Sequence, residues 1–193
     1  MSKKIKVAIF ASGSGSNAEN ICQYFRNSHQ IEIVSIFCNN ADAYVIERAT
    51  KLNLPIHIFT KEDFVENGIV MRLLDSEGID FVVLAGFLWL IPKFLVAKYP
   101  KRIINIHPAL LPNFGGKGMY GRKVHEAVKQ ANHSETGITI HFVNENYDEG
   151  DVIFQARTDV YLLDDADSIA QKVHELEYLY YPKIVEETIL KIF

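Results

Sequence analysis

Three side chains that could together transfer an acyl group to an amine stand in two short segments of the chain. Asn105 and His107 belong to the segment Asn-Ile-His-Pro, and Asp148 belongs to Asp-Glu-Gly. Transfer of an acyl or formyl group to an amine requires a donor for the oxyanion of a tetrahedral intermediate and a carrier for the proton of the attacking nitrogen. The Asn105 amide suits the first task, and the His107 imidazole suits the second or, if protonated, assists at the oxyanion. Asp148 can pair with the imidazole, bias its protonation and relay protons through water.

The position of Asn105 and His107 in the chain supports a shared site. They end an apolar run that reads as a strand, and side chains two residues apart lie on the same face of a strand. Ligands of open α/β sheets bind beyond the carboxyl ends of the strands. A histidine at a strand end is also common as a hydrogen-bonded structural residue, so the local pattern alone leaves both interpretations open.

A loop rich in serine and glycine, residues 11–18, follows the first apolar run and opens a helix. Its backbone N–H groups and the helix dipole favour an anion, so we expect Gly15, Ser16 and Asn17 to bind a phosphate. The loop also matches the dinucleotide pattern G-x-G-x-x-A, but the next strand ends in Phe-Cys-Asn-Asn without the acidic residue that would hold a ribose. A small phosphate ester is therefore favoured. The alternative is a tight turn that merely needs glycine.

The elements that would position these residues alternate between strands and helices. Apolar runs at 5–10, 31–38, 56–59, 81–85 and 103–106 read as strands, with further strands at 137–143 and 152–160 and helices near 120–130 and 165–190. Continuous apolar runs indicate strands that are covered on both faces. We therefore expect residues 1–193 to form a single α/β domain with a doubly wound, mostly parallel sheet. The irregular segment 107–118, with two prolines and three glycines, is typical of a functional loop.

Composition excludes several other classes. The formal net charge is −4, without long basic runs, which argues against a nucleic acid partner. No apolar stretch approaches the roughly 20 residues needed to span a bilayer, and the first residues lack a signal peptide, so we expect a cytoplasmic protein. Cys22 and Cys38 fit no zinc-binding spacing and are expected to be buried.

Several motifs carry a resemblance to a known family. Residues 105–112, Asn-Ile-His-Pro-Ala-Leu-Leu-Pro, resemble the N-I-H-P-S-L-L-P signature of folate-dependent formyltransferases, and residues 148–150 resemble their downstream D-x-G turn. The runs 85–88 and 136–143 and Glu177 ahead of Tyr-Pro extend the resemblance over nearly the whole chain. The resemblance implies a Rossmann-like formyltransferase fold and 10-formyltetrahydrofolate as co-substrate. No metal is expected, because no ligand spacing supports the alternative of a three-histidine site formed by His107, His125 and His141. Ala109 in place of serine and Trp89 where arginine is common depart from the pattern without touching the chemistry.

The resemblance also implies roles for individual residues. The phosphate loop is similar to that of the family branch that formylates glycinamide ribonucleotide in purine biosynthesis. By matched position Asn105, His107 and Asp148 resemble the catalytic groups, and Glu177 would contact the sugar hydroxyls. The folate would lie between an apolar wall and a facing loop, formed by Leu88, Trp89, Leu90 and Ile91 and by Asn144, Glu145, Asn146 and Tyr147. His125 and His141 match recurring family positions and would support the site from behind.

Two alternatives stay open at this point. A formyltetrahydrofolate hydrolase resembles the same centre but delivers the formyl group to water; it usually has an extra N-terminal regulatory domain, for which a first strand at residue 5 leaves no room. A non-catalytic phosphosugar-binding module would keep the glycine loop and make the other residues incidental. Formyltransferases that act on transfer RNA or sugar nucleotides would need a further C-terminal domain. We expect small-molecule substrates and a monomer or homodimer.

Overall fold

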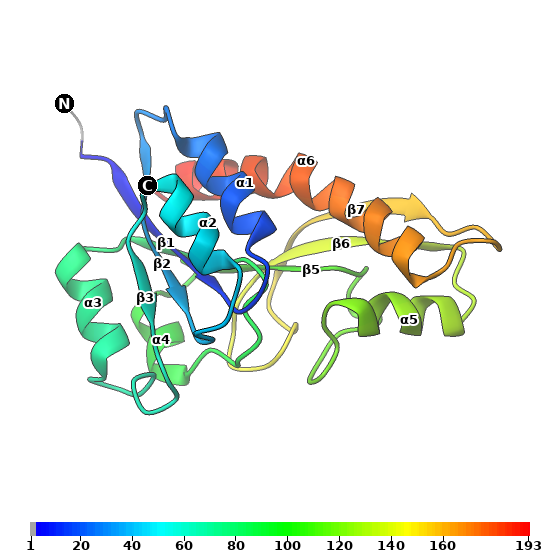
Figure 1. Ribbon diagram of the computed structural model, residues 1–193, viewed down its shortest axis with the longest axis horizontal. Coiled ribbons are helices and arrows are strands. Elements are labelled where there is room, and N and C mark those ends of the chain that lie inside the picture. The colour runs from blue at the N-terminus through cyan, green and yellow to red at the C-terminus, as the bar shows by residue number, and fades with distance from the viewer. Residues whose placement is uncertain (1–2) are drawn as a thin grey trace.

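The computed structural model describes residues 3–193, which are organised around a seven-stranded sheet (Figure 1). Along the chain the strands are β1 (Ile5–Ala11), β2 (Ile31–Cys38), β3 (Ile56–Ile58), β4 (Phe81–Leu84), β5 (Ile103–His107), β6 (Glu135–Phe142) and β7 (Val152–Asp159). Across the sheet they lie in the order β3-β2-β1-β4-β5-β6-β7. The strands from β3 to β5 are parallel, whereas β6 pairs antiparallel with both β5 and β7. The prediction of a mostly parallel sheet is confirmed.

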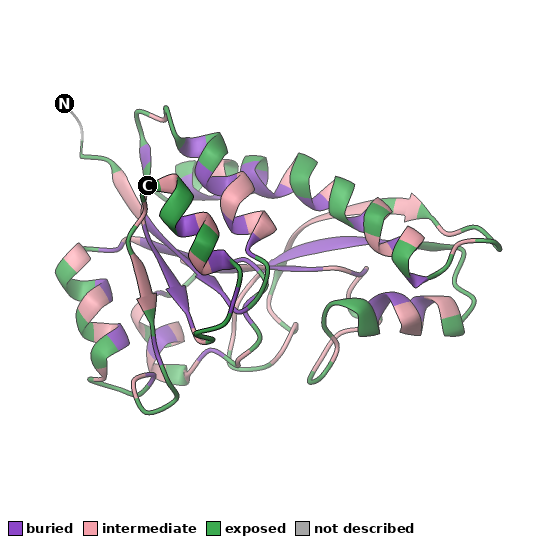
Figure 2. Ribbon diagram, viewed as in Figure 1, coloured by how far each residue is buried: buried purple, intermediate pink, exposed green. Residues whose placement is uncertain are grey.

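Helices cover both faces of this sheet, as Figures 1 and 2 show. On one face lie α1 (Ser16–Phe25), α2 (Val45–Leu52) and the long α6 (Ala166–Ile192); on the other lie α3 (Ile69–Glu77) and α4 (Lys93–Lys98). The remaining helix, α5 (Arg122–Gln130), packs against α6. The α/β, doubly wound class is therefore confirmed.

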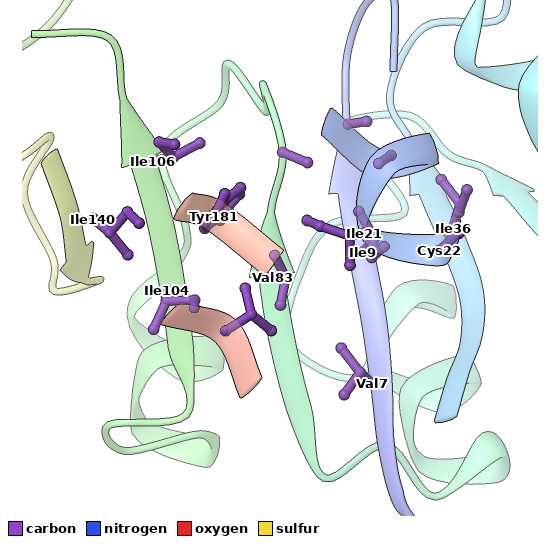
Figure 3. Packing of buried hydrophobic residues seen from close by; sticks show 14 of the residues in the cluster. Val7, Ile9, Ile21, Cys22, Ile36, Val83, Ile104, Ile106, Ile140 and Tyr181 are labelled. Atoms are coloured by element: carbon purple, nitrogen blue, oxygen red, sulfur yellow. The ribbon is translucent and has the colours of Figure 1, made fainter. Parts of the chain in front are cut away.

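Burial on both faces explains the continuous apolar runs of the central strands. In β1, Val7 and Ile9 belong to the core cluster under α1 and α6, and the alternate residues Ala8 and Phe10 belong to the cluster under α3 and α4. All four side chains are fully buried. Figure 3 shows the first cluster, in which Tyr181 of α6 lies among the aliphatic side chains of the strands.

The two cysteines are buried, as the sequence predicts. Cys22 lies in α1 and Cys38 ends β2, and both belong to the core cluster on the α1 face. Burial raises the pKa of the Cys22 thiol to about 12. Neither thiol is therefore ionised near neutral pH to any useful extent, which fits a packing role.

Polar contacts join α1 to α6 and set their relative position. Pro182 lies inside α6 and has no N–H, so the carbonyl of Tyr178 lacks its helical donor. Asn20 of α1 donates from Nδ2 to that carbonyl oxygen at 3.0 Å. One turn earlier, Asn17 Nδ2 donates to Glu177 Oε2 at 2.9 Å. The proline that interrupts α6 thus creates an attachment point for α1 and brings Glu177 beside the start of that helix.

Element boundaries differ from the sequence predictions by a few residues at most. One difference is that β5 includes His107, because this residue pairs with Thr139 of β6. The helix after the irregular segment begins at Arg122, since Gly121 has a φ of 54° and precedes the first helical turn. Within residues 3–193 no helix is both long enough and apolar enough to cross a membrane.

Candidate active site

A cavity of about 700 Å³ opens at the carboxyl ends of β1, β4 and β5. It is lined by the loop after β1 (residues 13–17), the segment after β4 (84–91), the end of β5 (105–108), the segment 116–122 and residues 146–148 of the turn before β7. His141, Val143 and His125 also line it, as do Asp167, Ala170, His174 and Glu177 of α6. All the predicted site residues line it except Asn144 and Glu145. Segments far apart in the sequence therefore converge at one edge of the sheet, where α/β folds bind their ligands.

Asn105 is held in place by a histidine on the neighbouring strand. His141 Nδ1 lies 2.8 Å from the carbonyl oxygen of Phe142, which can only accept, so this nitrogen carries the ring proton. His141 Nε2 then accepts from Asn105 Nδ2 at 3.2 Å. This bond uses one of the two N–H groups of the amide and leaves the second for a ligand oxygen. The amide thus faces the cavity as a fixed donor.

His107 is oriented by a backbone carbonyl from the irregular segment. Its Nε2 lies 2.8 Å from the carbonyl oxygen of Phe114, so Nε2 is the protonated nitrogen of the neutral ring. Its Nδ1 is then free to accept a proton. The residue is only 3% exposed, and this burial lowers the pKa of His107, although the nearby Asp148 carboxylate offsets part of the effect. A neutral imidazole with one free lone pair has the form of a general base.

Asp148 lies between the two histidines. Its Oδ2 is 3.4 Å from His107 Nδ1 and accepts from Gly116 N at 2.9 Å, and its Oδ1 is 3.7 Å from His141 Nε2. Burial alone would raise the pKa of Asp148, but its contacts with His107 and the Gly116 N–H lower it, and the pKa lies below its usual value. The carboxylate is therefore ionised near neutral pH and stabilises a proton on His107.

The turn that carries Asp148 depends on a glycine. Asp148 has a φ of 57°, in the left-handed region that Asp tolerates better than most residues. Two residues later, a Cβ on Gly150 would lie 1.7 Å from the Phe142 carbonyl oxygen. The Asp-x-Gly pattern is thus a steric requirement of the turn that aims the carboxylate.

Buried hydroxyl contacts hold the segment that supplies the Phe114 carbonyl. Thr139 of β6 is fully buried; its Oγ1 donates to the Ala109 carbonyl at 2.7 Å and accepts from Leu111 N at 2.9 Å. Further along the segment, a Cβ on Gly115 would lie 2.5 Å from a Leu111 methyl group and 3.3 Å from Asp148 Cβ. The segment therefore packs directly against the carboxylate that it helps to position.

The glycine loop forms the opposite end of the cavity. Gly15 has a φ of 73° and precedes α1, so the first N–H groups of the helix have no helical partners. A Cβ on Gly15 would lie 2.4 Å from Val45 Cγ2, which explains why this position requires glycine. Ser12 Oγ accepts from Leu88 N at 3.0 Å and fixes the loop to the segment after β4. The arrangement suits an anion at Gly15 and Ser16.

Glu177 adds a buried carboxylate beside this loop. It is 4% exposed, and its Oε2 accepts from Asn17 Nδ2 at 2.9 Å and pairs with His174 Nδ1 at 2.8 Å. Within residues 3–193 both contacts fall on Oε2, which leaves Oε1 for a ligand hydroxyl. The bond to Glu177 raises the pKa of His174. The bond to Glu177 uses one of the two N–H groups of the Asn17 amide, so the second N–H remains as a donor beside the backbone and hydroxyl groups of the loop.

The wall after β4 provides apolar surface. Leu88 and Leu90 line the cavity and are 42% and 41% exposed. Trp89 and Ile91 line it too, and Asn146 and Tyr147 line it from the turn before β7. Such exposed aliphatic side chains fit a flat heterocycle, as a pterin is.

Two predicted folate contacts lie outside the cavity lining. Asn144 Oδ1 accepts from Asn146 N at 2.9 Å and so shapes the turn. Glu145 pairs with Lys93 at the protein surface, with 2.6 Å between Oε2 and Nζ. Of the four turn residues expected at the folate, Asn146 and Tyr147 thus line the cavity, and contacts of Asn144 and Glu145 with the folate stay a prediction. Within residues 3–193 no group of three or more His, Cys, Asp or Glu residues is placed to hold a metal ion.

Sequence reasoning missed several groups of the site. The Phe114 carbonyl and the Gly116 N–H are backbone groups, and no residue type signals them. His174 lies three residues before Glu177, a spacing that puts both on one face of a helix and could have indicated the pair. His141 was expected as a supporting residue. In the structure it holds the Asn105 amide by a hydrogen bond and lies beside Asp148.

Comparison with known proteins agrees with this geometry. Residues 5–185 match the family model described as formyl transferase. The chain therefore belongs to the formyl transferase family. It is 34% identical over 188 residues to a phosphoribosylglycinamide formyltransferase of Bacillus subtilis, an alignment that covers 94% of this chain and 93% of that protein. The crystal structure of a phosphoribosylglycinamide formyltransferase from Bacillus halodurans superposes with a TM-score of 0.87 at 33% identity, covering 97% of each chain.

Plant relatives are longer than this chain. The chloroplastic phosphoribosylglycinamide formyltransferase of Arabidopsis thaliana is 40% identical over 189 residues, which are 95% of this chain and 65% of the plant protein. The corresponding protein of Vigna unguiculata is covered over 61% of its length. The chain thus spans a little under two thirds of these two relatives.

Proposed function

We propose that this protein is a phosphoribosylglycinamide formyltransferase, which transfers the formyl group of 10-formyltetrahydrofolate to the amine of glycinamide ribonucleotide. One observation carries the proposal: Asn105, His107 and Asp148 share a cavity with the glycine loop and with the apolar wall after β4. The three polar residues suit formyl transfer, the glycine loop suits a phosphate, and the apolar wall suits a pterin. Relatives that bear this name cover the chain over nearly its whole length.

In the proposed mechanism, the glycine loop binds the ribose phosphate, and Glu177 Oε1 accepts from a sugar hydroxyl. The substrate amine is thereby directed toward His107 and Asn105. The apolar wall of Leu88 and Leu90 holds the folate on the other side of the reacting carbon. Fixing both substrates in one orientation supplies much of the rate enhancement expected of such a site.

The amine nitrogen then attacks the formyl carbon, and its excess proton passes to His107 Nδ1, directly or through water and Asp148. Asn105 donates its free N–H to the oxyanion that develops on the formyl oxygen, and the protonated His107 adds positive charge nearby. Asp148, 3.4 Å from Nδ1, stabilises that imidazolium. When the bond from the formyl carbon to the folate nitrogen breaks, the proton returns to the leaving nitrogen.

One assay tests the proposal. The purified protein is incubated with 10-formyltetrahydrofolate, with and without glycinamide ribonucleotide, and the formation of tetrahydrofolate is followed. Turnover that depends on the ribonucleotide supports the transferase. Turnover without it identifies a hydrolase, and no turnover in either case leaves a phosphosugar-binding module; both results would refute the proposal. The His107→Ala variant serves as a matched control for activity carried over from the host.

A further inference from the structure

His125 is a buried side chain of the cavity wall for which the mechanism above has no task. It lies in α5, lines the cavity and is only 2% exposed. Its Nδ1 is enclosed and has no hydrogen-bond partner within residues 3–193, and no bond to Nε2 is found there either. Buried polar groups nearly always have partners, so an imidazole without one in the wall of a cavity indicates a partner that arrives with the ligand.

The charge state of this ring follows from its surroundings. Burial lowers the pKa of His125, and His174 lowers it further, against a smaller opposing effect of Glu177. The ring is therefore neutral at pH 7 and carries one N–H. Because Nδ1 is enclosed without an acceptor, a proton there would be an unsatisfied buried donor, which is costlier than an unused lone pair. The proton belongs on Nε2, and the cavity is where this donor finds an acceptor.

The position of His125 defines which part of a substrate it can reach. The ring is close enough to both His107 and Glu177 for each to influence its ionisation. In the proposed function, the reacting amine lies at His107 and the sugar hydroxyls at Glu177. The glycinamide amide joins these two parts of the substrate, and its carbonyl oxygen is a strong acceptor.

We propose that His125 is a substrate-binding residue whose Nε2–H donates to the amide carbonyl oxygen of glycinamide ribonucleotide. This inference rests on the proposed function, because it takes the substrate from there. It gives the site a means of recognising the amide, separate from the sugar and the phosphate. A pocket built around a hydrogen bond discriminates strongly against ligands that lack the matching group.

Two substitutions separate binding from packing. His125→Leu fills a similar volume without a donor, whereas His125→Gln keeps an N–H close to the position of Nε2. His29→Gln, at an exposed histidine outside the cavity lining, is the control. Each variant is titrated by calorimetry with glycinamide ribonucleotide and with ribose 5-phosphate, which lacks the amide, and its thermal unfolding is recorded.

We expect His125→Leu to weaken binding of glycinamide ribonucleotide about tenfold and to leave binding of ribose 5-phosphate unchanged. His125→Gln should recover most of the loss, and in turnover the Leu variant should change KM more than kcat. Equal weakening of both ligands, unchanged affinity for the ribonucleotide, or no recovery with Gln would overturn the inference. The readout is binding and is therefore independent of turnover. If the wild-type protein binds the ribonucleotide but transfers no formyl group, the proposed function is refuted, and the binding test of His125 can still be carried out.

Discussion

Asp148 Oδ2 lies 3.4 Å from His107 Nδ1, while the other nitrogen of the same ring donates to the carbonyl of Phe114. The imidazole therefore has one nitrogen fixed by the backbone and one nitrogen directed at a carboxylate. A proton taken up during the reaction can reside only on Nδ1, where Asp148 stabilises it. The pair is thus arranged to accept a proton and return it within one turnover.

Loss of the imidazole should remove proton transfer without unfolding the protein. We expect His107→Ala to lower kcat by about 10²-fold or more, the usual effect of losing an acid–base group. Steady-state kinetics with both substrates measure the effect, and circular dichroism checks the fold. Activity within a fewfold of wild type would exclude His107 as the proton carrier.

Asp148→Asn should change the pH profile as well as the rate. The Asp148 charge raises the pKa of His107 against the larger effect of burial, so its removal lowers that pKa further. In the proposed mechanism the base form of His107 is the active form, so kcat of the wild type should rise with pH and level off below neutrality. In the variant, the plateau should fall and the acid limb should move to lower pH. An acid limb that stays in place would show that Asp148 does not act through His107.

The geometry of parallel strands was enough to predict that Asn105 and His107 lie together at one edge of the sheet. Side chains two apart share a strand face, and parallel strands end together. Asp148 could be added because the resemblance supplies its position, and the glycine loop because a strand, a glycine turn and a helix specify an anion site. These features depend on local sequence or on short motifs.

The remaining features depend on contacts that no local pattern encodes. Asn17 was expected to bind phosphate, and its bond from Nδ2 to Glu177 was not predicted, since α6 comes to lie beside α1 only in the folded chain. Glu145 was expected at the folate, and its pairing with Lys93 at the surface was not predicted. The segment around Phe114 contacts His107 through a backbone carbonyl oxygen, which any residue type would supply. The sequence therefore could not indicate this contact.

Buried histidines should make stability depend on pH in a defined direction. Burial lowers the pKa of His107 and His125 below 6.5, so the unfolded chain binds more protons than the native state between the two pKa values. The contribution of these two histidines to the unfolding free energy is complete above pH 6.5. It is lost as the pH falls through their pKa values in the folded protein. The Glu177 bond raises the pKa of His174, so its contribution is present below pH 6.5 and is lost as the pH rises through the folded pKa.

Urea unfolding at several pH values between 5 and 8 tests this balance. From pH 6.5 to 5, His125→Gln should flatten the loss of unfolding free energy. From pH 6.5 to 8, the wild type should lose the His174 contribution as this ring deprotonates, and His174→Gln should remove that part of the loss. The opposite sign in either variant would contradict the assigned charge states.

Two glycines of the same loop should differ sharply in their tolerance of alanine. Gly15 has a φ of 73°, and a Cβ there would lie 2.4 Å from Val45 Cγ2. We expect Gly15→Ala to lower the unfolding free energy by about 1–2 kcal/mol from the backbone strain, with steric displacement of α2 in addition. A Cβ on Gly13 meets no atom within 4 Å, so Gly13→Ala should stay within about 0.5 kcal/mol of wild type. Equal effects in urea unfolding would disprove the steric account of the loop.

The attachment of α1 to α6 can be tested by a double-mutant cycle on Asn20 and Pro182. Asn20 donates to the Tyr178 carbonyl, which is free only because Pro182 has no N–H. Asn20→Ala should therefore cost about 1 kcal/mol of unfolding free energy in the wild-type background. In a Pro182→Ala background, the new alanine N–H can satisfy that carbonyl, so the same change should cost less, with a coupling of about 0.5 kcal/mol or more. Additive costs would mean that the Asn20 bond does not compensate for the proline, and that α1 is held to α6 by apolar packing and by the Asn17 and Tyr24 contacts.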